Sequence, residues 1–258
     1  MALQAIILDV EGTMAETDDV KRAAFNQAFA EVGLDWVWSR ALYRQIRQNT
    51  LDGDEIEYFA LLRHPDQFNK LEASGLLGEV PVRQRRIYRD LLEAGAAPLR
   101  PGVARLMAEA LSERVKLAVC STGARLDFET LLYTRFGPDM LNALAASVAE
   151  EDLLGGSPIE AYSLLLRRLD IAPSDIAVIE DSGPGTAAAA RLGMMVLATP
   201  GYYTMADNFA DAALVLSDLG HPAAPFAVLK GQAPGIGHVT ISALRYWLMQ
   251  SQAGVRAA

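Results

Sequence analysis

Two carboxylates stand two positions apart where an apolar run of the chain ends. Residues 5–8 are apolar, Asp9 follows them directly, and Glu11 comes just before Gly12. A carboxylate at the end of a buried strand can act as a nucleophile, and a second carboxylate beside it can move a proton. This stretch is therefore a candidate reaction centre.

A second segment offers groups that could bind phosphate. Ser121, Thr122 and Gly123 follow the apolar run at residues 117–120. Hydroxyl groups and a glycine at a strand-to-helix turn can present side-chain and backbone donors to phosphate oxygens. The same residue types also cap helices, which is their commoner role.

An acidic pair, Glu180 and Asp181, follows another apolar run at residues 176–179. Carboxylates gathered at one place repel one another unless a cation joins them, and Mg²⁺ prefers such oxygen ligands together with water and phosphate. One acidic residue alone is more often a cap or a solvated loop residue. A nucleophilic carboxylate, a Mg²⁺ site and a phosphate-binding turn together predict phosphoryl transfer through an aspartyl-phosphate.

Apolar runs and helical spacing alternate along the chain and predict the elements that position these residues. The predicted strands are residues 5–10, 115–120, 143–148, 176–179, 195–198 and 213–216. The predicted helices are residues 17–32, 42–46, 56–62, 82–92, 101–111, 126–132, 159–169, 185–192 and 239–250. Residues 220–238 are rich in Pro and Gly and are predicted to be a connector.

Strands that alternate with helices indicate an α/β fold with a doubly wound parallel sheet. Because no strand pattern occurs between the first predicted strand and about residue 98, a helical block interrupts the sheet domain. We predict an α/β core of residues 1–16 and 99–258 and a helical cap domain of residues 17–98. Ligands of such sheets bind at the carboxyl ends of the strands, where the candidate residues stand.

The composition disfavours several classes of function. The net charge of −9 argues against non-specific nucleic-acid binding, which needs clustered Lys and Arg. No apolar run reaches the roughly 18 residues of a membrane span, and the N-terminus lacks a signal-peptide pattern. The single cysteine, Cys120, excludes an internal disulfide. We expect a cytoplasmic protein without a membrane or nucleic-acid partner; a monomer is favoured, although the sequence does not fix the oligomeric state.

The segments LDVEGT, VCSTG and VIEDSGPGTAAAARLGM resemble motifs one, two and four of the haloacid dehalogenase (HAD) superfamily. The segments LRPGVARLM, GLDWVWSRALYRQI and PGYYTMADNFADAALVLSDLG are similar to its CbbY-like branch of sugar-phosphate phosphatases, which dephosphorylate xylulose 1,5-bisphosphate. The resemblance extends to about Gly220. It implies a HAD-like Rossmannoid core, a helical cap that closes over the substrate, and Mg²⁺ as cofactor.

The resemblance also implies a role for each matching residue. Asp9 is expected to attack phosphorus, and Glu11 to act as general acid and base while its backbone carbonyl binds Mg²⁺. Ser121 is expected to hydrogen-bond the phosphoryl oxygens. The predicted substrate-binding residues are Ser121, Thr122, Gly123 and Arg125, and the predicted metal ligands are Asp9, Glu11, Glu180 and Asp181.

Two departures from the family pattern bear on activity. The family has Asp where this chain has Glu11, and a misplacement of about 1 Å in a catalytic group can cost on the order of 100-fold in rate. Motif three normally supplies a lysine, but alignment on Tyr162 places Gly156 at that position. Arg125 could supply the missing charge, or it could be a solvated residue in the first turn of a helix.

The cap sequence does not decide whether the substrate carries a second phosphate group. Arg44, Arg47 and residues 83–86 could meet one, or they could form solvated helix faces. The segment TLDGDEIEYF at residues 50–59 is acidic where the branch would carry a basic substrate loop. Two functions follow: a Mg²⁺-dependent phosphatase for a small phosphorylated metabolite, or a catalytically silent HAD-like protein that binds a ligand or a partner. A dehalogenase is disfavoured, because those enzymes do not need the acidic pair.

Overall fold

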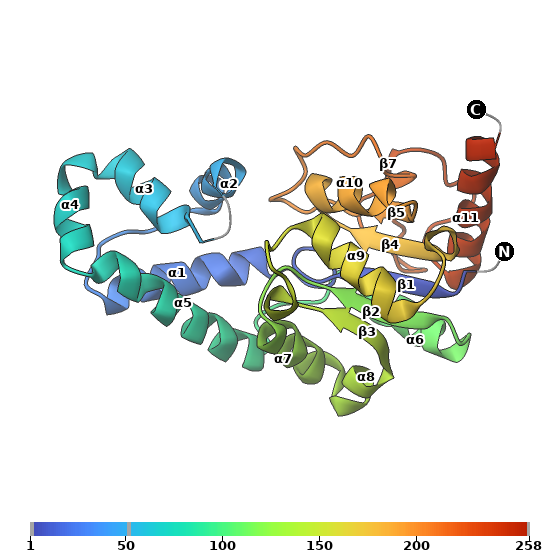
Figure 1. The fold of residues 1–258 in the computed structure, drawn as a ribbon, viewed down its shortest axis with the longest axis horizontal. Helices are drawn as coiled ribbons and strands as arrows, with labels where there is room; N and C mark the ends of the chain where they lie inside the picture. Colours follow the sequence, from blue (N-terminus) through green and yellow to red (C-terminus); the bar gives the residue numbers. More distant parts are fainter. Residues whose placement is uncertain (1–2, 51–52, 257–258) are drawn as a thin grey trace. The chain divides into compact units, whose positions relative to one another are not determined.

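A computed structural model describes residues 3–50 and 53–256 of the chain. The chain divides into two compact units, which we call the core unit (Met1–Glu16 with Pro98–Ala258) and the cap unit (Thr17–Ala97). Figure 1 shows the elements of both. Among the described residues, no helix combines the length and the apolar character that crossing a bilayer requires.

The core unit is built around a seven-stranded sheet in the order β3-β2-β1-β4-β5-β6-β7. Neighbouring strands are parallel, except for β6 and β7, which are antiparallel. The strands are β1 (Ala5–Asp9), β2 (Lys116–Cys120), β3 (Leu144–Val148), β4 (Ile176–Glu180), β5 (Met195–Ala198), β6 (Leu214–Leu216) and β7 (Val228–Lys230). The predicted α/β fold with a doubly wound parallel sheet is confirmed.

Helices flank this sheet (Figure 1). They are α6 (Val103–Ser112), α7 (Arg125–Phe136), α8 (Pro138–Ala143), α9 (Pro158–Leu169), α10 (Gly183–Arg191) and α11 (Ile241–Arg256). One hydrophobic cluster joins Tyr162 and Leu165 of α9 and Ala189 of α10 to Ile7 and Val178 of the sheet. β1 and β4 consist of buried apolar residues apart from their last positions, as expected of strands covered on both faces.

The strand order places β1 between β2 and β4. In the parallel register Asp9 lies opposite Cys120, and Leu8 lies opposite Ile179. The residues that follow β2 and end β4 therefore leave the sheet on either side of Asp9. This is the topological switch point at which open α/β sheets bind ligands.

The described residues of the cap unit form helices and no strand. The helices are α1 (Asp18–Glu31), α2 (Arg40–Asn49), α3 (Glu55–Arg63), α4 (Pro65–Ala73) and α5 (Leu76–Glu93). Aromatic rings form its core: the ring of Trp38 lies 4.8 Å from the rings of both Phe25 and Phe29, centroid to centroid. A small helical unit of this kind depends on such large buried side chains for its apolar contacts.

Among the α-helices and strands of the described residues, two helices and one strand lie outside the sequence-based prediction. β7 falls within residues 220–238, where only a connector is predicted, and α4 and α8 are additional helices. α4 and α8 bury no residue, and β7 is a three-residue exposed strand at the sheet edge, so none of them carries the apolar periodicity on which the prediction rests. Within the acidic segment 50–59, Leu51 and Asp52 lie outside the described residues.

Candidate active site

Three carboxylates meet at the carboxyl edge of the sheet. One oxygen from each of Asp9, Glu180 and Asp181 lies within 4.8 Å of the others. Asp9 is partly buried, and desolvation of its carboxyl group by the surrounding protein, together with the charges of Glu180, Asp181 and Glu11, raises its pKa well above its usual range. Burial also raises the pKa of Glu180. A set of hard oxygen donors that repel one another in this way fits a divalent cation such as Mg²⁺.

Hydrogen bonds from four donors orient Glu180. Its Oε2 accepts from the backbone N–H groups of Asp181 and Ser182, both at 2.9 Å, and from the Ser182 hydroxyl at 3.0 Å. The Tyr162 hydroxyl donates to Oε1 at 3.1 Å. Tyr162 is not among the site residues predicted from the sequence. The one available signal is that a tyrosine on the apolar face of a helix needs a partner for its hydroxyl group.

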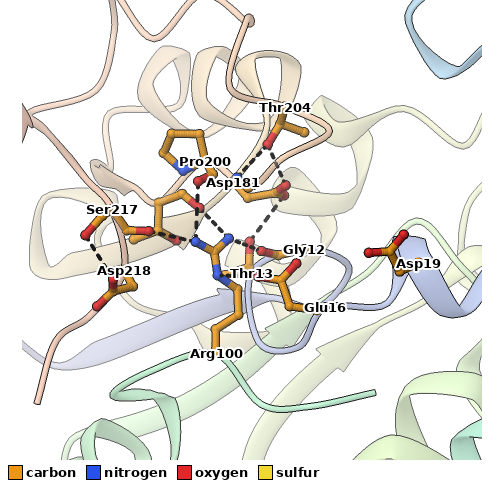
Figure 2. Close-up of polar contacts among 12 residues, drawn as sticks. Gly12, Thr13, Glu16, Asp19, Arg100, Asp181, Pro200, Thr204, Ser217 and Asp218 are labelled. Atoms are coloured by element: carbon orange, nitrogen blue, oxygen red, sulfur yellow. Dashed lines mark hydrogen bonds and ion pairs between the residues drawn. The ribbon is translucent and has the colours of Figure 1, made fainter. Parts of the chain in front are cut away.

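Two threonine hydroxyls contact Asp181 (Figure 2). Thr13 Oγ1 lies 3.4 Å from Oδ1, and Thr204 Oγ1 donates to Oδ2 at 2.9 Å. At Gly12 the backbone has a φ of +80°, and an added Cβ would lie 2.4 Å from Asp181 Oδ2. Both the conformation and the close approach therefore require glycine at this position. Thr204 comes from the loop after β5 and is not among the site residues predicted from the sequence.

Glu11 points toward the end of β2, and its carboxylate lies outside the acidic cluster. Ser121 Oγ lies 3.2 and 3.1 Å from its two carboxylate oxygens, and the Gly123 N–H donates to Ser121 Oγ at 2.9 Å. An added Cβ at Gly123 would lie 2.7 Å from Glu11 Oε1. The structure thus brings Glu11 to two of the predicted phosphate-binding residues, with Thr122 partly buried between them in the chain. The backbone contact of Glu11 with Mg²⁺ stays a prediction.

Gly156, which aligns with the motif-three lysine of the family, offers no side chain to the site. Gly156 is exposed, has a φ of +64°, and has no atom within 4 Å of an added Cβ. The strongest influences on the pKa of Asp9 are burial and three carboxylates, opposed by a hydrogen bond from Thr13. None of these influences is cationic.

Arg125 is engaged beside the end of β3. Its Nη1 donates to Ser147 Oγ at 2.9 Å, and its Nη2 forms an ion pair with Asp152. The Glu151 carboxylate accepts a hydrogen bond from the Arg125 backbone N–H at 3.0 Å. The guanidinium therefore already has a carboxylate partner, and its role as a substitute for the lysine stays a prediction.

Replacing Asp152 by Asn should lower the free energy of unfolding by about 1–2 kcal/mol at pH 7, after allowance for partial solvent screening. Asp152 accepts from Arg168 Nη2 at 2.7 Å and from the Ala149 N–H at 3.0 Å. The Arg168 hydrogen bond, the Ala149 hydrogen bond and the nearby Arg125 charge lower the pKa of Asp152 from 3.8 to about 2. Because this pKa lies below that of the unfolded chain, the stabilisation is complete above about pH 4 and is lost as the pH falls toward 2.

Urea unfolding at pH 7 and at about pH 3 measures this effect. Glu129→Gln is the matched control, since Glu129 Oε1 lies 3.8 Å from Arg125 Nη1 and its side chain is 39% exposed. Its effect should stay below about 0.5 kcal/mol at both pH values. A loss of stability in Asp152→Asn that does not shrink at the lower pH would contradict the expected linkage.

Gly185 leaves room for the Glu180 carboxylate, because an added Cβ would lie 1.6 Å from Oε1. Gly185→Ala should therefore displace Glu180, lower the free energy of unfolding by about 1–3 kcal/mol and weaken Mg²⁺ binding at least about tenfold. Thermal unfolding with and without Mg²⁺ measures both effects. Gly78→Ala in α5 is the control, because nothing lies within 4 Å of its added Cβ; it should leave the response to Mg²⁺ unchanged. An equal response in both variants would sink the prediction.

Comparison with known proteins decides the family. The model of the haloacid dehalogenase-like hydrolases matches residues 3–193. The chain belongs to this family. Protein CbbY of Cupriavidus necator is 34% identical to this HAD hydrolase over 248 residues, which cover 95% of this chain and 96% of that protein. The predicted HAD membership and the CbbY-like resemblance are thereby confirmed.

Two further relatives of this HAD hydrolase bear on its chemistry. A crystal structure of a mutant CbbY from Rhodobacter sphaeroides in complex with xylulose 1,5-bisphosphate is 32% identical, with a TM-score of 0.71, and the match covers 86% of this chain and 98% of that one. The phosphorylated carbohydrates phosphatase of Thermotoga maritima is 26% identical over 194 residues, covering 74% of this chain and 82% of that protein. The prediction of a HAD-type phosphoric monoester hydrolase is confirmed at the level of the family.

Proposed function

We propose that this protein is a Mg²⁺-dependent phosphatase that hydrolyses a small phosphorylated sugar through an aspartyl-phosphate on Asp9. The observation that carries the proposal is the meeting of three strand ends. Asp9 lies between the turn that begins at Ser121 and the acidic pair Glu180-Asp181. Membership of a hydrolase family supports the same chemistry.

Each side chain has a role in this proposal. The Asp9 carboxylate attacks phosphorus, and the bond from phosphorus to the sugar oxygen breaks. Glu11 protonates the leaving oxygen and then takes a proton from the water that attacks phospho-Asp9. The Ser121 hydroxyl and the Gly123 N–H donate to the phosphoryl oxygens. Because Ser121 Oγ lies against the Glu11 carboxylate, the phosphoryl group has to take over this hydrogen bond when the substrate binds.

The acidic cluster would hold the Mg²⁺, together with the backbone carbonyl of Glu11. The cation would offset the negative charge that the carboxylates and the phosphate bring to one place. The Glu180 oxygens already accept four hydrogen bonds from protein donors.

The cap unit favours a sugar with one phosphate. Three of the arginines predicted to meet a second phosphate have carboxylate partners within this unit: Arg47 pairs with Asp18, Arg83 with Glu31 and Glu79, and Arg86 with Glu31 and Asp90. A pocket of about 610 Å³ is lined by Gln48, Asn49, Thr50, Asp54, Glu57, Tyr58 and Leu61. Its two carboxylates disfavour a second phosphate, whereas its amide and hydroxyl groups suit sugar hydroxyls.

Other properties follow from the same proposal. The substrate is a small molecule, and no nucleic-acid or membrane partner is proposed. We propose a cytoplasmic enzyme that acts as a monomer. Size-exclusion chromatography with light scattering measures the oligomeric state directly.

Phosphate release in the presence of Mg²⁺, measured over a panel of sugar phosphates, tests the proposal. The panel pairs sugar monophosphates with the corresponding bisphosphates and includes xylulose 1,5-bisphosphate, which the Rhodobacter sphaeroides CbbY binds. We expect Mg²⁺-dependent release, at least as efficient from a monophosphate as from its bisphosphate. No release from folded wild-type protein with any of these substrates would overturn the proposed activity.

Two observations favour a second candidate function. Gly156 leaves the motif-three position without a side chain, and no cation is among the strongest influences on Asp9. A catalytically silent HAD-like protein that binds a ligand or a partner would tolerate the loss of this positive charge. Such a protein would release no phosphate from any substrate in the panel and would show no tight Mg²⁺-dependent binding of a phosphate mimic such as vanadate.

A further inference from the structure

Arg100 is a buried cation in the core unit to which the proposed reaction assigns no task. Its side chain is 5% exposed, and it lies below the Asp181 site in Figure 2. The guanidinium donates to the carbonyl oxygen of Gly12, to that of Thr199 at 2.7 Å and to that of Ser217 at 2.9 Å. One side chain therefore joins three loops that are far apart in the sequence.

Charge pairing alone does not account for this position. The carboxylate that pairs with the guanidinium is that of Glu16, whose Oε1 lies 3.4 Å from Arg100 Nε, and the Glu16 side chain is itself 43% exposed. The remaining partners are main-chain carbonyls, which a planar guanidinium with five N–H donors can bridge. A lysine ammonium keeps the charge but presents its donors from a single point. Replacing Arg100 by Lys therefore separates the bridging of the carbonyl groups from the positive charge.

The bridged loops also carry the two hydroxyls that contact Asp181. Gly12 directly precedes Thr13, whose Oγ1 lies 3.4 Å from Oδ1 of Asp181. Thr199 is followed by Pro200 and Gly201, and the Gly201 N–H donates to Thr204 Oγ1 at 3.0 Å. Thr204 Oγ1 in turn donates to Asp181 Oδ2 at 2.9 Å. Each oxygen of the Asp181 carboxylate thus meets a hydroxyl from a loop that Arg100 anchors.

We infer that Arg100 is a positioning residue that orients Asp181 for Mg²⁺ by fixing the loop after β1 and the loop after β5. This inference rests on the proposed function, because it assumes that Asp181 is a metal ligand. The protein partners of a metal ligand typically change metal affinity or activity by about 10–100-fold when they are removed. Arg100 does not touch Asp181 itself and acts through Thr13 and Thr204.

Arg100→Lys in the full-length protein tests the inference. We expect the rise in melting temperature with Mg²⁺ to require about tenfold more Mg²⁺ than in the wild type. We also expect the Mg²⁺ concentration for half-maximal phosphate release to rise by a similar factor, while saturating Mg²⁺ largely restores kcat. Rescue by excess metal is a result that a merely structural loss would not produce.

Arg105→Lys is the matched control. Arg105 also donates to backbone carbonyls, those of Leu219 and Gly220 at 3.3 and 3.4 Å, and it forms an ion pair with Glu109. None of these contacts leads to Asp181. We expect Arg105→Lys to change the melting temperature without changing the response to Mg²⁺.

The outcomes separate this inference from the proposed function. A wild-type response to Mg²⁺ that Arg100→Lys retains in full overturns the inference and leaves the metal site standing. No response in the wild type overturns both. If Arg100→Lys does not fold, Thr204→Val tests the same chain of contacts: a folded variant that requires about tenfold more Mg²⁺ supports it, and an unchanged response overturns it.

Discussion

Replacing Asp9 by Asn should reduce Mg²⁺-dependent phosphate release by at least about 10⁴-fold, because removing a nucleophile abolishes the covalent route altogether. Asn has nearly the same shape as Asp, so packing at the end of β1 should be preserved. The variant keeps Ser121 and Gly123, and it should still bind substrate. The expected loss is therefore in kcat and not in KM, and initial rates at saturating substrate measure it.

The same substitution should stabilise the metal-free protein. Burial and three neighbouring carboxylates raise the pKa of Asp9, which means that the charged form is disfavoured in the folded state. Removing this charge should raise the free energy of unfolding in the absence of metal. The stabilisation that Mg²⁺ adds should become smaller, since one ligand has lost its charge. Activity and stability thus move in opposite directions.

Asp211→Asn is the control for Asp9→Asn. Asp211 is exposed on the loop before β6, outside the acidic cluster, so its substitution should change neither the rate nor the response to Mg²⁺. An Asp9→Asn variant that is folded and retains more than about 1% of the wild-type rate would exclude a covalent intermediate on Asp9. A metal-free variant less stable than the wild type would show that repulsion within the cluster is already offset in the protein.

The neighbourhood of the site could be predicted from sequence because each part follows a buried strand. β1, β2 and β4 are short runs of apolar residues, and strands that alternate with helices form parallel sheets whose carboxyl ends share one edge. The order of the elements is then enough to bring Asp9, Ser121 and Glu180 together. The register adds only which residues stand level with one another.

The residues that orient these groups could not be predicted in the same way. Tyr162 contacts Glu180 across 18 positions, Thr204 contacts Asp181 across 23, and Arg100 contacts Gly12 across 88. Contacts over such separations depend on how loops and helices pack, and a lone tyrosine, threonine or arginine has no local pattern that reports them. The segment LRPGVARLM contains Arg100, but in the sequence it indicates only a similarity to the CbbY-like branch and gives no role for this arginine.

The direction of the Glu11 side chain could not be predicted from the sequence either. The spacing of Asp9 and Glu11 indicates a nucleophile beside a proton-transfer group but does not say which neighbour the Glu11 carboxylate contacts, and in the structure it lies against Ser121 and not in the acidic cluster. A rotamer choice at one residue decides this, and composition and periodicity do not report rotamers. Whether the longer Glu11 side chain can act as the acid and base therefore has to be measured by kinetics.

Replacing Glu11 by Gln should lower kcat by about 10²–10⁴-fold with little change in KM, because Gln keeps the length of the side chain but can neither give nor take the proton. Glu150→Gln is the matched control. Glu150 is exposed in the turn after β3, and its contact with the β2 turn is a backbone hydrogen bond to the Gly123 carbonyl at 2.8 Å, which the substitution leaves intact. Steady-state kinetics with saturating Mg²⁺ compares the two.

Glu11→Asp then separates acid–base chemistry from reach. If Glu11 serves as the acid and base in its present position, the shorter side chain should lose part of the rate, about 10²-fold for a displacement near 1 Å, and still exceed Glu11→Gln. A rate above the wild type would mean instead that the Glu11 carboxylate competes with the phosphoryl group for the Ser121 hydroxyl and holds the enzyme back. Equal rates in Glu11→Asp, Glu11→Gln and the wild type would remove Glu11 from the mechanism, and another group would have to protonate the leaving oxygen.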